Sequence, residues 1–306
     1  MKVAITGATG FVGSHLVQQL HSLGYQIVVL TRNPDRGRRV FPITNYPQVE
    51  MVRYTPTEAG SWEDAIAGCD GVVNLAGAPI ADERWTEARK RELYQSRVIQ
   101  TQKLVLACTK ATPKPQVLVS TSAIGYYGTS ETATFDESSP PGNDFLANLC
   151  QQWEAAAAPV KNSDIRLVIL RFGIVLGMGG ALGKMLTPFK LFAGGPLGSG
   201  KQWFSWIHIS DLVNLIRFSL ENPQVEGVLN ATAPNPVRMN ELCQQMGQIM
   251  NRPSWLPVPS FALEMLLGDA AIVVLEGQQV LPLRPQSYNF QYQYSTVKPA
   301  LEEILA

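Results

Sequence analysis

Histidine and cysteine are scarce in this sequence, and neither sign of charge predominates. Three histidines and four cysteines are scattered over 306 residues, and no two cysteines form a CxxC pair. This spacing predicts no metal centre and favours reduced, buried thiols over a disulfide framework. Because 25 basic side chains balance 25 acidic ones, the composition indicates neither a nucleic acid nor an anionic membrane surface as a partner.

Long apolar runs are also missing. The longest candidate, residues 261–275, is interrupted by Glu264, Gly268 and Asp269, so we expect no membrane span. A buried strand pattern begins at residue 2, which leaves no room for a signal or transit peptide. We therefore expect a cytoplasmic protein, with the plastid stroma as the alternative if a transit peptide has been removed.

The strongest motif lies at the beginning of the chain, where a strand pattern over residues 2–6 leads through a glycine turn into a helical pattern. Gly7 allows the tight turn, Gly10 lets the backbone approach a pyrophosphate, and Gly13 lets the helix pack closely. Free backbone N–H groups at the start of the helix would hold the phosphates. A glycine turn used only for packing is the alternative. The residues expected at this phosphate site are Gly7, Gly10, Phe11, Val12 and Gly13.

The end of the second strand, residues 26–30, predicts which dinucleotide binds. An NAD site would place an acidic residue there, whereas this chain has Thr31 and Arg32. A charge-assisted contact between Arg32 and a 2′-phosphate, about 1.5–3 kcal/mol, corresponds to a preference for NADP of about 10- to 100-fold. Arg32 could instead be one more solvated charge in a basic loop.

Two further strand ends carry candidate site residues. Residues 71–77 read as a buried strand, and Leu75, Ala76 and Gly77 at its end would lie beside an adenosine or ribose, although plain packing would look similar. A strand over 116–120 runs into a cluster of hydroxyl groups that contains Ser122, Tyr126 and Tyr127. Open α/β sheets place their chemistry at such carboxyl ends.

The remaining elements complete a fold prediction. We expect a long helix over 85–109, a sixth strand over 165–175, and a helix capped by Ser210 with Asp211 in its first turn. Together they predict an α/β Rossmann fold, a doubly wound parallel sheet with a small, mainly helical C-terminal substrate lobe. The expected NADP-binding domain is 1–175 with 207–232 returning to it, and the lobe is 176–206 and 233–306.

These patterns resemble the extended, epimerase-like branch of the short-chain dehydrogenases/reductases. Within that branch the chain is similar to an atypical family whose members are described as sugar-nucleotide epimerases or cell-division inhibitors, and which includes a plastid-division protein. The motifs that carry the resemblance are Asn74-Leu75-Ala76-Gly77, Arg84-Trp85, Ser96-Arg97, Gly125-Tyr126-Tyr127-Gly128, Trp153-Glu154-Ala155-Ala156, Gly173-Ile174-Val175-Leu176-Gly177, residues 205–209 (SWIHI) and residues 275–278 (LEGQ).

The resemblance implies a set of NADP contacts. It places them on Thr31, Arg32, Leu75, Ala76, Glu92, Arg97 and Ile174. Arg97 stands where the broader branch usually has an asparagine, so it could meet a cofactor phosphate or a substrate anion. Pairing with Glu92 is the alternative, although a spacing of five residues is a poor one for a helical pair.

The catalytic pair of the superfamily is missing. Its Tyr-x-x-x-Lys motif would fall on Leu146 and Cys150, and a shift of one residue gives Phe145 and Leu149. None of these side chains suits acid–base work.

Part of the hydroxyl cluster remains, because Ser122 stands near the position of the family's substrate-orienting serine. Tyr126 or Tyr127 could act as a displaced proton donor only beside a cation that lowers the tyrosine pKa. Lys201 and Arg97 are the candidate cations. The alternative is that the tyrosines pack and Ser122 caps a turn.

Two functions therefore remain open. One is an NADP(H)-dependent oxidoreductase or nucleotide-sugar epimerase that acts on an unknown small molecule. The other is a non-catalytic, NADP(H)-dependent regulatory or scaffold protein, for which the resemblance suggests cell or plastid division as the setting. A homodimer would fit either function.

Overall fold

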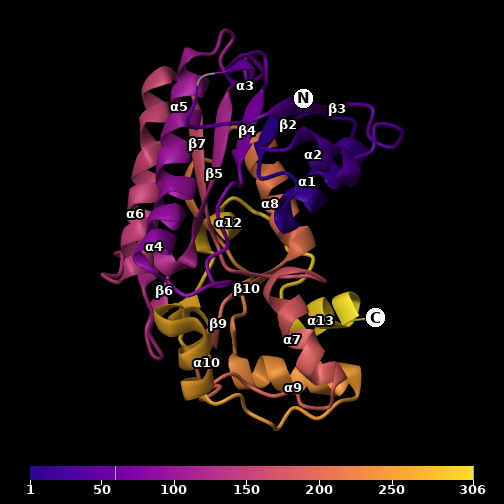
Figure 1. The fold of residues 1–306 in the computed structure, drawn as a ribbon, viewed down its shortest axis with the longest axis vertical. Coiled ribbons are helices and arrows are strands. Elements are labelled where there is room, and N and C mark those ends of the chain that lie inside the picture. Colours follow the sequence, from indigo (N-terminus) through magenta and orange to yellow (C-terminus); the bar gives the residue numbers. More distant parts are fainter. Residues whose placement is uncertain (59, 306) are drawn as a thin grey trace.

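The computed structural model describes residues 1–58 and 60–305. Its central feature is a parallel sheet of seven strands (Figure 1). The strand order is β11-β7-β5-β4-β1-β2-β3. Because the order reverses direction between β1 and β4, a crevice opens there at the carboxyl edge of the sheet. The strands are β1 (Lys2–Thr6), β2 (Gln26–Thr31), β3 (Val49–Arg53), β4 (Gly71–Asn74), β5 (Val117–Ala123), β7 (Arg166–Phe172) and β11 (Gly227–Ala231). The predicted doubly wound Rossmann fold is confirmed.

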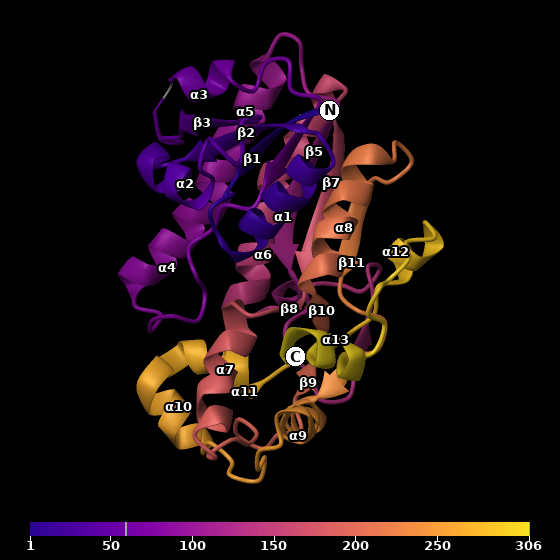
Figure 2. The same ribbon diagram turned by 90° about the vertical axis from the view of Figure 1, so that its right-hand side faces the viewer.

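Helices cover both faces of the sheet (Figure 2). Alternate side chains of a strand point to opposite faces: Val3 and Ile5 pack with Leu16 of α1 and Ile216 of α8, whereas Ala4 lies in the core beneath α5. The helices on the first face are α1 (Phe11–Ser22) and α8 (Ile209–Glu221), and those on the second include α5 (Gln100–Lys110) and α6 (Phe145–Ala157). Short helices α2 (Pro34–Val40) and α3 (Ser61–Asp64) follow β2 and β3.

The long helix predicted over 85–109 contains an irregular turn. It consists of α4 (Glu87–Tyr94), the π-helical turn η1 (Gln95–Ile99) and α5. Such a turn inserts one residue into the ordinary helical spacing and occurs frequently at functional sites. Here it carries Ser96 and Arg97.

The smaller lobe has its own core, in which Leu182, Trp206, Leu242 and Leu301 are fully buried. Its strands pair as β8 (Ile174–Leu176) with β10 (Trp206–His208), and β9 (Trp203–Phe204) with β12 (Val237–Arg238). The helices are α7 (Gly180–Lys190), α9 (Met239–Met250), α10 (Ser260–Leu267), η4 (Gly268–Ala271), α11 (Ile272–Leu275) and α13 (Val297–Leu305), whereas α12 (Leu283–Ser287) packs against β11 of the main sheet. Three short elements, η2 (Ile124–Tyr127), β6 (Thr134–Phe135) and η3 (Ala158–Ser163), complete the sheet side, and β13 (Gln279–Val280) pairs with β6. The domain boundaries remain a prediction.

The predicted cap of α8 is wrong by two residues. The helix begins at Ile209, and His208 occupies the cap position, where its Nδ1 accepts a hydrogen bond of 3.2 Å from the backbone N–H of Ser210. Sequence reasoning chose Ser210 because a hydroxyl is the commoner cap. Asp211 does lie in the first turn, where it accepts hydrogen bonds from the backbone N–H groups of Gln293 and Tyr294.

Two observations concern the chain as a whole. All four cysteines are buried and free, as predicted. Within the described residues, no helix combines the length and the apolar character that crossing a membrane requires.

Candidate functional site

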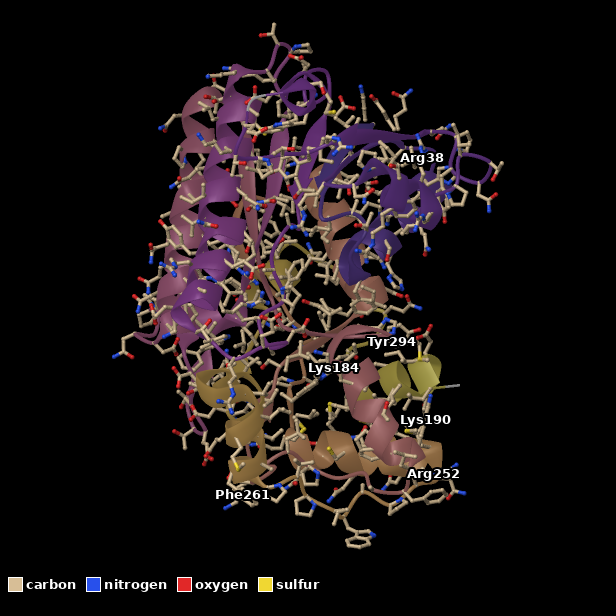
Figure 3. The ribbon with its side chains drawn as sticks, in the orientation of Figure 1. Arg38, Lys184, Lys190, Arg252, Phe261 and Tyr294 are labelled. Atoms are coloured by element: carbon tan, nitrogen blue, oxygen red, sulfur yellow. The ribbon has the colours of Figure 1, made fainter. Side chains whose placement is uncertain are left out.

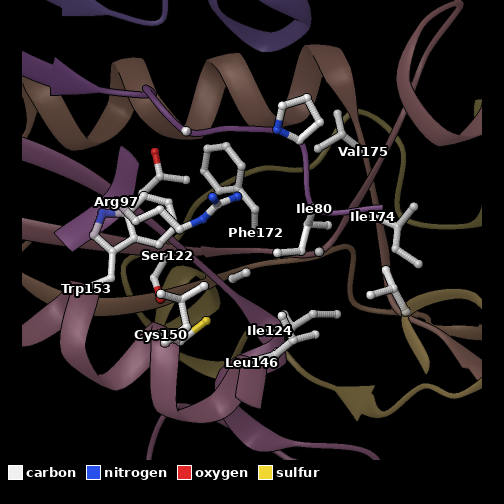
Figure 4. Close-up of a pocket in the computed structure, with 18 of the residues that line it drawn as sticks. Ile80, Arg97, Ser122, Ile124, Leu146, Cys150, Trp153, Phe172, Ile174 and Val175 are labelled. Carbon is white, nitrogen blue, oxygen red and sulfur yellow. The ribbon is translucent and has the colours of Figure 1, made fainter. Parts of the chain in front are cut away.

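A cavity of about 620 Å³ opens at the crevice between β1 and β4. It extends from the glycine turn, past the end of β5, to the segment around α11. Figure 4 shows the part of it between Arg97 and Ile174. Most of the predicted site residues line it, namely Gly7, Gly10, Phe11, Val12, Gly13, Leu75, Ala76, Gly77, Arg97, Ser122 and Ile174. The other predicted residues, Thr31, Arg32, Glu92, Tyr126 and Tyr127, do not belong to its lining.

The glycine turn has the shape that a dinucleotide requires. Gly7 has a φ of +68°, and a Cβ built on it would lie 2.6 Å from the carbonyl oxygen of Leu75. A Cβ on Gly13 would lie 2.3 Å from the carbonyl oxygen of Gly7. Gly10 caps α1 with no side-chain hydrogen bond, so backbone N–H groups of the first turn face the cavity edge free for phosphates. The residues present therefore fit a dinucleotide.

The end of β2 lies beside this turn. Leu30 pairs with Thr6, so Thr31 and Arg32 follow at the level of Gly7. Arg32 is exposed, and Asn33 next to it caps α2 by accepting a hydrogen bond from the N–H of Arg36. The Arg32 side chain is thus placed at the outer edge of the site, where an adenosine ribose would end.

Arg97 lies inside the cavity. Its guanidinium stacks on the ring of Trp153, 5.3 Å from the ring centre, and donates a hydrogen bond of 2.9 Å to the carbonyl oxygen of Ala78. Burial lowers the pKa of Arg97 to about 10, so the side chain still carries its charge at neutral pH. The alternative pairing with Glu92 is wrong, because Glu92 forms its ion pair with Arg89 at 2.6 Å.

The two positions where the superfamily has tyrosine and lysine do line the cavity. Leu146 and Cys150 both lie on α6, one turn apart. Burial, together with the charge of Glu154, raises the pKa of the Cys150 thiol to about 12. Neither side chain can therefore exchange a proton at neutral pH.

The predicted hydroxyl groups are held by a buried polar network. Ser122 donates a hydrogen bond of 2.7 Å to Glu154, which forms an ion pair with Arg171. The Tyr127 hydroxyl donates to Asn230 at 2.7 Å and accepts from Arg171 at 2.9 Å. Of the three predicted catalytic residues, Ser122 therefore borders the cavity, while the Tyr127 hydroxyl points into the protein.

Arg171 is the cation beside the tyrosines, so the candidates Lys201 and Arg97 were wrong for that role. Its guanidinium lies 3.3 Å from the ring centre of Tyr126 and bonds the hydroxyl of Tyr127. Burial nevertheless raises the pKa of Tyr127 to about 12 despite this charge. The signal in the sequence was an arginine within the apolar strand 166–172, which requires a buried acidic partner.

The fold and the cavity define an α/β protein with a dinucleotide-type site at the topological switch point of its sheet. The family model for the NAD dependent epimerase/dehydratase family matches residues 3–231, and a domain of unknown function, DUF1731, matches residues 258–304. The chain belongs to the NAD-dependent epimerase/dehydratase family, and the resemblance found in the sequence is confirmed.

Several relatives match this chain along the whole of its length or nearly so. The chain is 50% identical to the chloroplastic SDR39U1 homolog of Arabidopsis thaliana, an epimerase family protein, with 100% of this chain and 87% of the relative covered. It is 37% identical to the epimerase family protein YfhF of Bacillus subtilis, with coverages of 100% and 98%. The crystal structure of human SDR39U1 with NADPH superposes with a TM-score of 0.87 at 38% identity, covering 99% of each chain.

Proposed function

We propose that this protein is an NADP(H)-dependent oxidoreductase that acts on a small molecule in the cavity described above. The observation that carries the proposal is the fit of the glycine turn to a dinucleotide, at the mouth of a cavity that continues past the end of β5. A human relative with 38% identity was crystallised with NADPH. The nicotinamide would supply or accept a hydride when bound.

The residues of this chain would divide the work along the cavity. Backbone N–H groups between Gly7 and Gly13 would hold the pyrophosphate, and Arg32 would bind the 2′-phosphate that distinguishes NADP from NAD. Arg97, fixed by Trp153, would bind a phosphate or an anionic substrate group. Ser122 would orient the reacting oxygen, since it borders the cavity beside Cys150.

A second candidate is a non-catalytic, NADP(H)-dependent regulatory or scaffold protein. One observation favours it: Leu146 and Cys150 face the cavity where proton transfer would be needed, and the nearby hydroxyls of Ser122 and Tyr127 already donate to protein acceptors. Such a protein would change its state with nucleotide binding and would need no proton donor.

Nucleotide titration tests the shared part of both candidates. We expect NADPH to bind more tightly than NADH by about 10- to 100-fold, and Arg32→Ala to remove most of that preference. Arg39→Ala is the matched control, since Arg39 is an exposed arginine in the last turn of α2, the helix that follows Arg32. If neither nucleotide binds to folded protein, both candidates fail; if Arg32→Ala keeps the preference, another group reads the 2′-phosphate.

Turnover separates the candidates. The protein saturated with NADPH, and separately with NADP⁺, would be tested against carbonyl compounds, alcohols and sugar nucleotides. Turnover that Ser122→Ala diminishes supports the oxidoreductase. No turnover over the whole panel, with the nucleotide shown to be bound, would favour the regulatory protein.

A further inference from the structure

The part of the cavity beyond the glycine turn is lined by branched aliphatic side chains. Figure 4 shows Ile80, Ile124 and Leu146 gathered near Ile174, while Arg97 and Trp153 lie at the other end. These side chains come from separate segments: the loop after β4, η2 at the end of β5, α6, and β8. We call this group, together with Ile272 and Val273 of α11, the aliphatic end.

The polar side chains near the aliphatic end already have partners within the protein. Asp144 caps α6 by accepting a hydrogen bond of 2.8 Å from the N–H of Ala147. The Gln278 amide donates at 2.8 Å to the carbonyl oxygen of Ile124. Thr129 donates its hydroxyl to Glu276. A ligand with many hydroxyl groups would therefore find few free hydrogen-bond partners here, and its own polar groups would be left unpaired.

Among the described residues, only one cation lines this cavity, which is few for a second diphosphate beside that of the cofactor. Among its lining residues in the described chain, the charged ones are Arg97 and Asp144. The lysines and arginines of the smaller lobe lie elsewhere: Lys184 pairs with Asp82 on the surface, while Lys190 and Arg252 lie toward its outer part (Figure 3). Arg252 covers the ring of Phe192. A nucleotide sugar would thus find a single cation, Arg97, for its diphosphate and few free partners for its hydroxyl groups.

We infer that the aliphatic end binds a small apolar carbonyl compound, or the corresponding alcohol, and not a nucleotide sugar. This inference rests on the proposed oxidoreductase function and names its substrate class. In the reductive direction the carbonyl carbon accepts the hydride of NADPH and the C=O π bond breaks. The oxygen takes a proton from water, so that an alcohol, NADP⁺ and hydroxide result.

Calorimetric titration tests the substrate class apart from the cofactor. Naphthaldehyde, an apolar aromatic aldehyde, and UDP-glucose would each be titrated into the protein with and without NADP⁺, which permits no reduction. We expect naphthaldehyde to bind at least about tenfold more tightly than UDP-glucose. Leu146→Asn keeps the size of the side chain and adds a polar group, so it should weaken naphthaldehyde binding by about tenfold.

Control variants keep the result interpretable. Leu191→Asn is the same substitution at a side chain that is 72% exposed and should leave binding unchanged. Ile80→Asn, in a loop, replaces Leu146→Asn if the helix variant unfolds, as shown by thermal melting.

The outcomes are distinct. The inference is overturned if UDP-glucose binds more tightly, if neither compound binds, or if both cavity variants bind naphthaldehyde normally. Failure of NADP⁺ and NADPH to bind would instead remove the proposed function, and the titration without nucleotide would still decide whether the aliphatic end accepts apolar ligands.

Discussion

Glu154 and Arg171 form a bidentate ion pair next to Ser122, which lines the cavity. The Nε of Arg171 lies 2.7 Å from Oε1 of Glu154, and its Nη2 lies 2.8 Å from Oε2. Burial disfavours the arginine charge, but the hydrogen bonds and charge of Glu154 outweigh it and raise the pKa of Arg171. Since Ser122 bonds the same carboxylate and Tyr127 bonds the same guanidinium, this pair fixes both hydroxyl groups.

Breaking the pair on one side should strongly destabilise the fold. Glu154→Leu leaves a buried guanidinium without its countercharge, for which we expect a loss of about 3–5 kcal/mol in the free energy of unfolding. Adding Arg171→Met should restore part of that loss, because no buried charge then remains. Urea unfolding followed by circular dichroism measures all three proteins.

The control for the ion pair is Lys298→Ala, which removes an exposed pair with Glu302 at 3.9 Å. Its expected effect is within about 1 kcal/mol. If Glu154→Leu proves no more destabilising than Lys298→Ala, the buried pair contributes no more to the free energy of unfolding than an exposed pair does.

The close approach at Gly13 predicts a loss of nucleotide binding on substitution. Gly13→Ala would place a Cβ 2.3 Å from the Gly7 carbonyl oxygen, so the turn must open and its N–H groups must shift. We expect NADPH to bind at least about tenfold more weakly. Gly60→Ala is the control, because Gly60 has extended backbone and its Cβ would meet the Trp62 ring at an ordinary 3.5 Å. Normal NADPH affinity in Gly13→Ala would show that the turn serves packing alone.

The sequence permitted prediction of the fold and the glycine turn because both follow local rules. Strands with apolar runs and a glycine turn that leads into a helix restrict the topology strongly. The polar network was not predictable in the same way, because Arg171, Glu154 and Asn230 come from separate elements and meet only after folding. Nor does helical periodicity indicate the π-helical turn that carries Arg97.

Substitutions of Arg97 and of Arg32 should have different effects on the preference of the protein for NADPH over NADH. Arg32 would contact only the 2′-phosphate, whereas Arg97 lies inside the cavity beside Gly77, a part of the site common to both nucleotides. Arg97→Gln should therefore weaken NADPH and NADH binding by a similar factor, about tenfold. Fluorescence titration with each nucleotide measures this. A loss confined to NADPH would move Arg97 to the 2′-phosphate site, and no loss for either nucleotide would favour an anionic substrate as its ligand.

The buried side chain of His208 should make the free energy of unfolding decrease in mildly acidic solution. Burial lowers its pKa in the folded protein, although Glu303 at 3.0 Å opposes the shift. His208 therefore binds a proton more readily in the unfolded chain than in the folded protein. The fold loses stability as the pH falls below the ordinary histidine pKa of about 6.5. His208→Asn replaces the capping Nδ1 with an amide oxygen, so the helix keeps a cap that does not titrate, and the variant should show a smaller fall in melting temperature between about pH 7 and about pH 5.5.

A control for that pH dependence is His21→Asn, since His21 packs on Tyr46 and is not among the groups that shift the pKa of His208. Its melting temperature should fall with acidification as steeply as that of the unmodified protein. An equally steep fall in His208→Asn would assign the effect to other groups that bind protons more readily in the unfolded chain. Asp211 is not such a group, because burial raises its pKa in the folded protein and acidification then favours the fold.

Tyr127→Phe separates a structural hydroxyl from a catalytic one. The hydroxyl lies between Asn230 and Arg171, and the pKa of Tyr127 is raised to about 12, so at neutral pH it stays protonated and bonded within the protein. We expect the variant to lose about 1–3 kcal/mol in the free energy of unfolding, because a buried amide oxygen loses its donor. NADPH affinity and kcat should stay within about twofold, whereas Ser122→Ala, at the cavity edge, should lower kcat by about tenfold. A folded Tyr127→Phe protein that binds NADPH but has lost turnover would make Tyr127 the proton donor, and the hydroxyl would then have to leave Asn230 during the reaction.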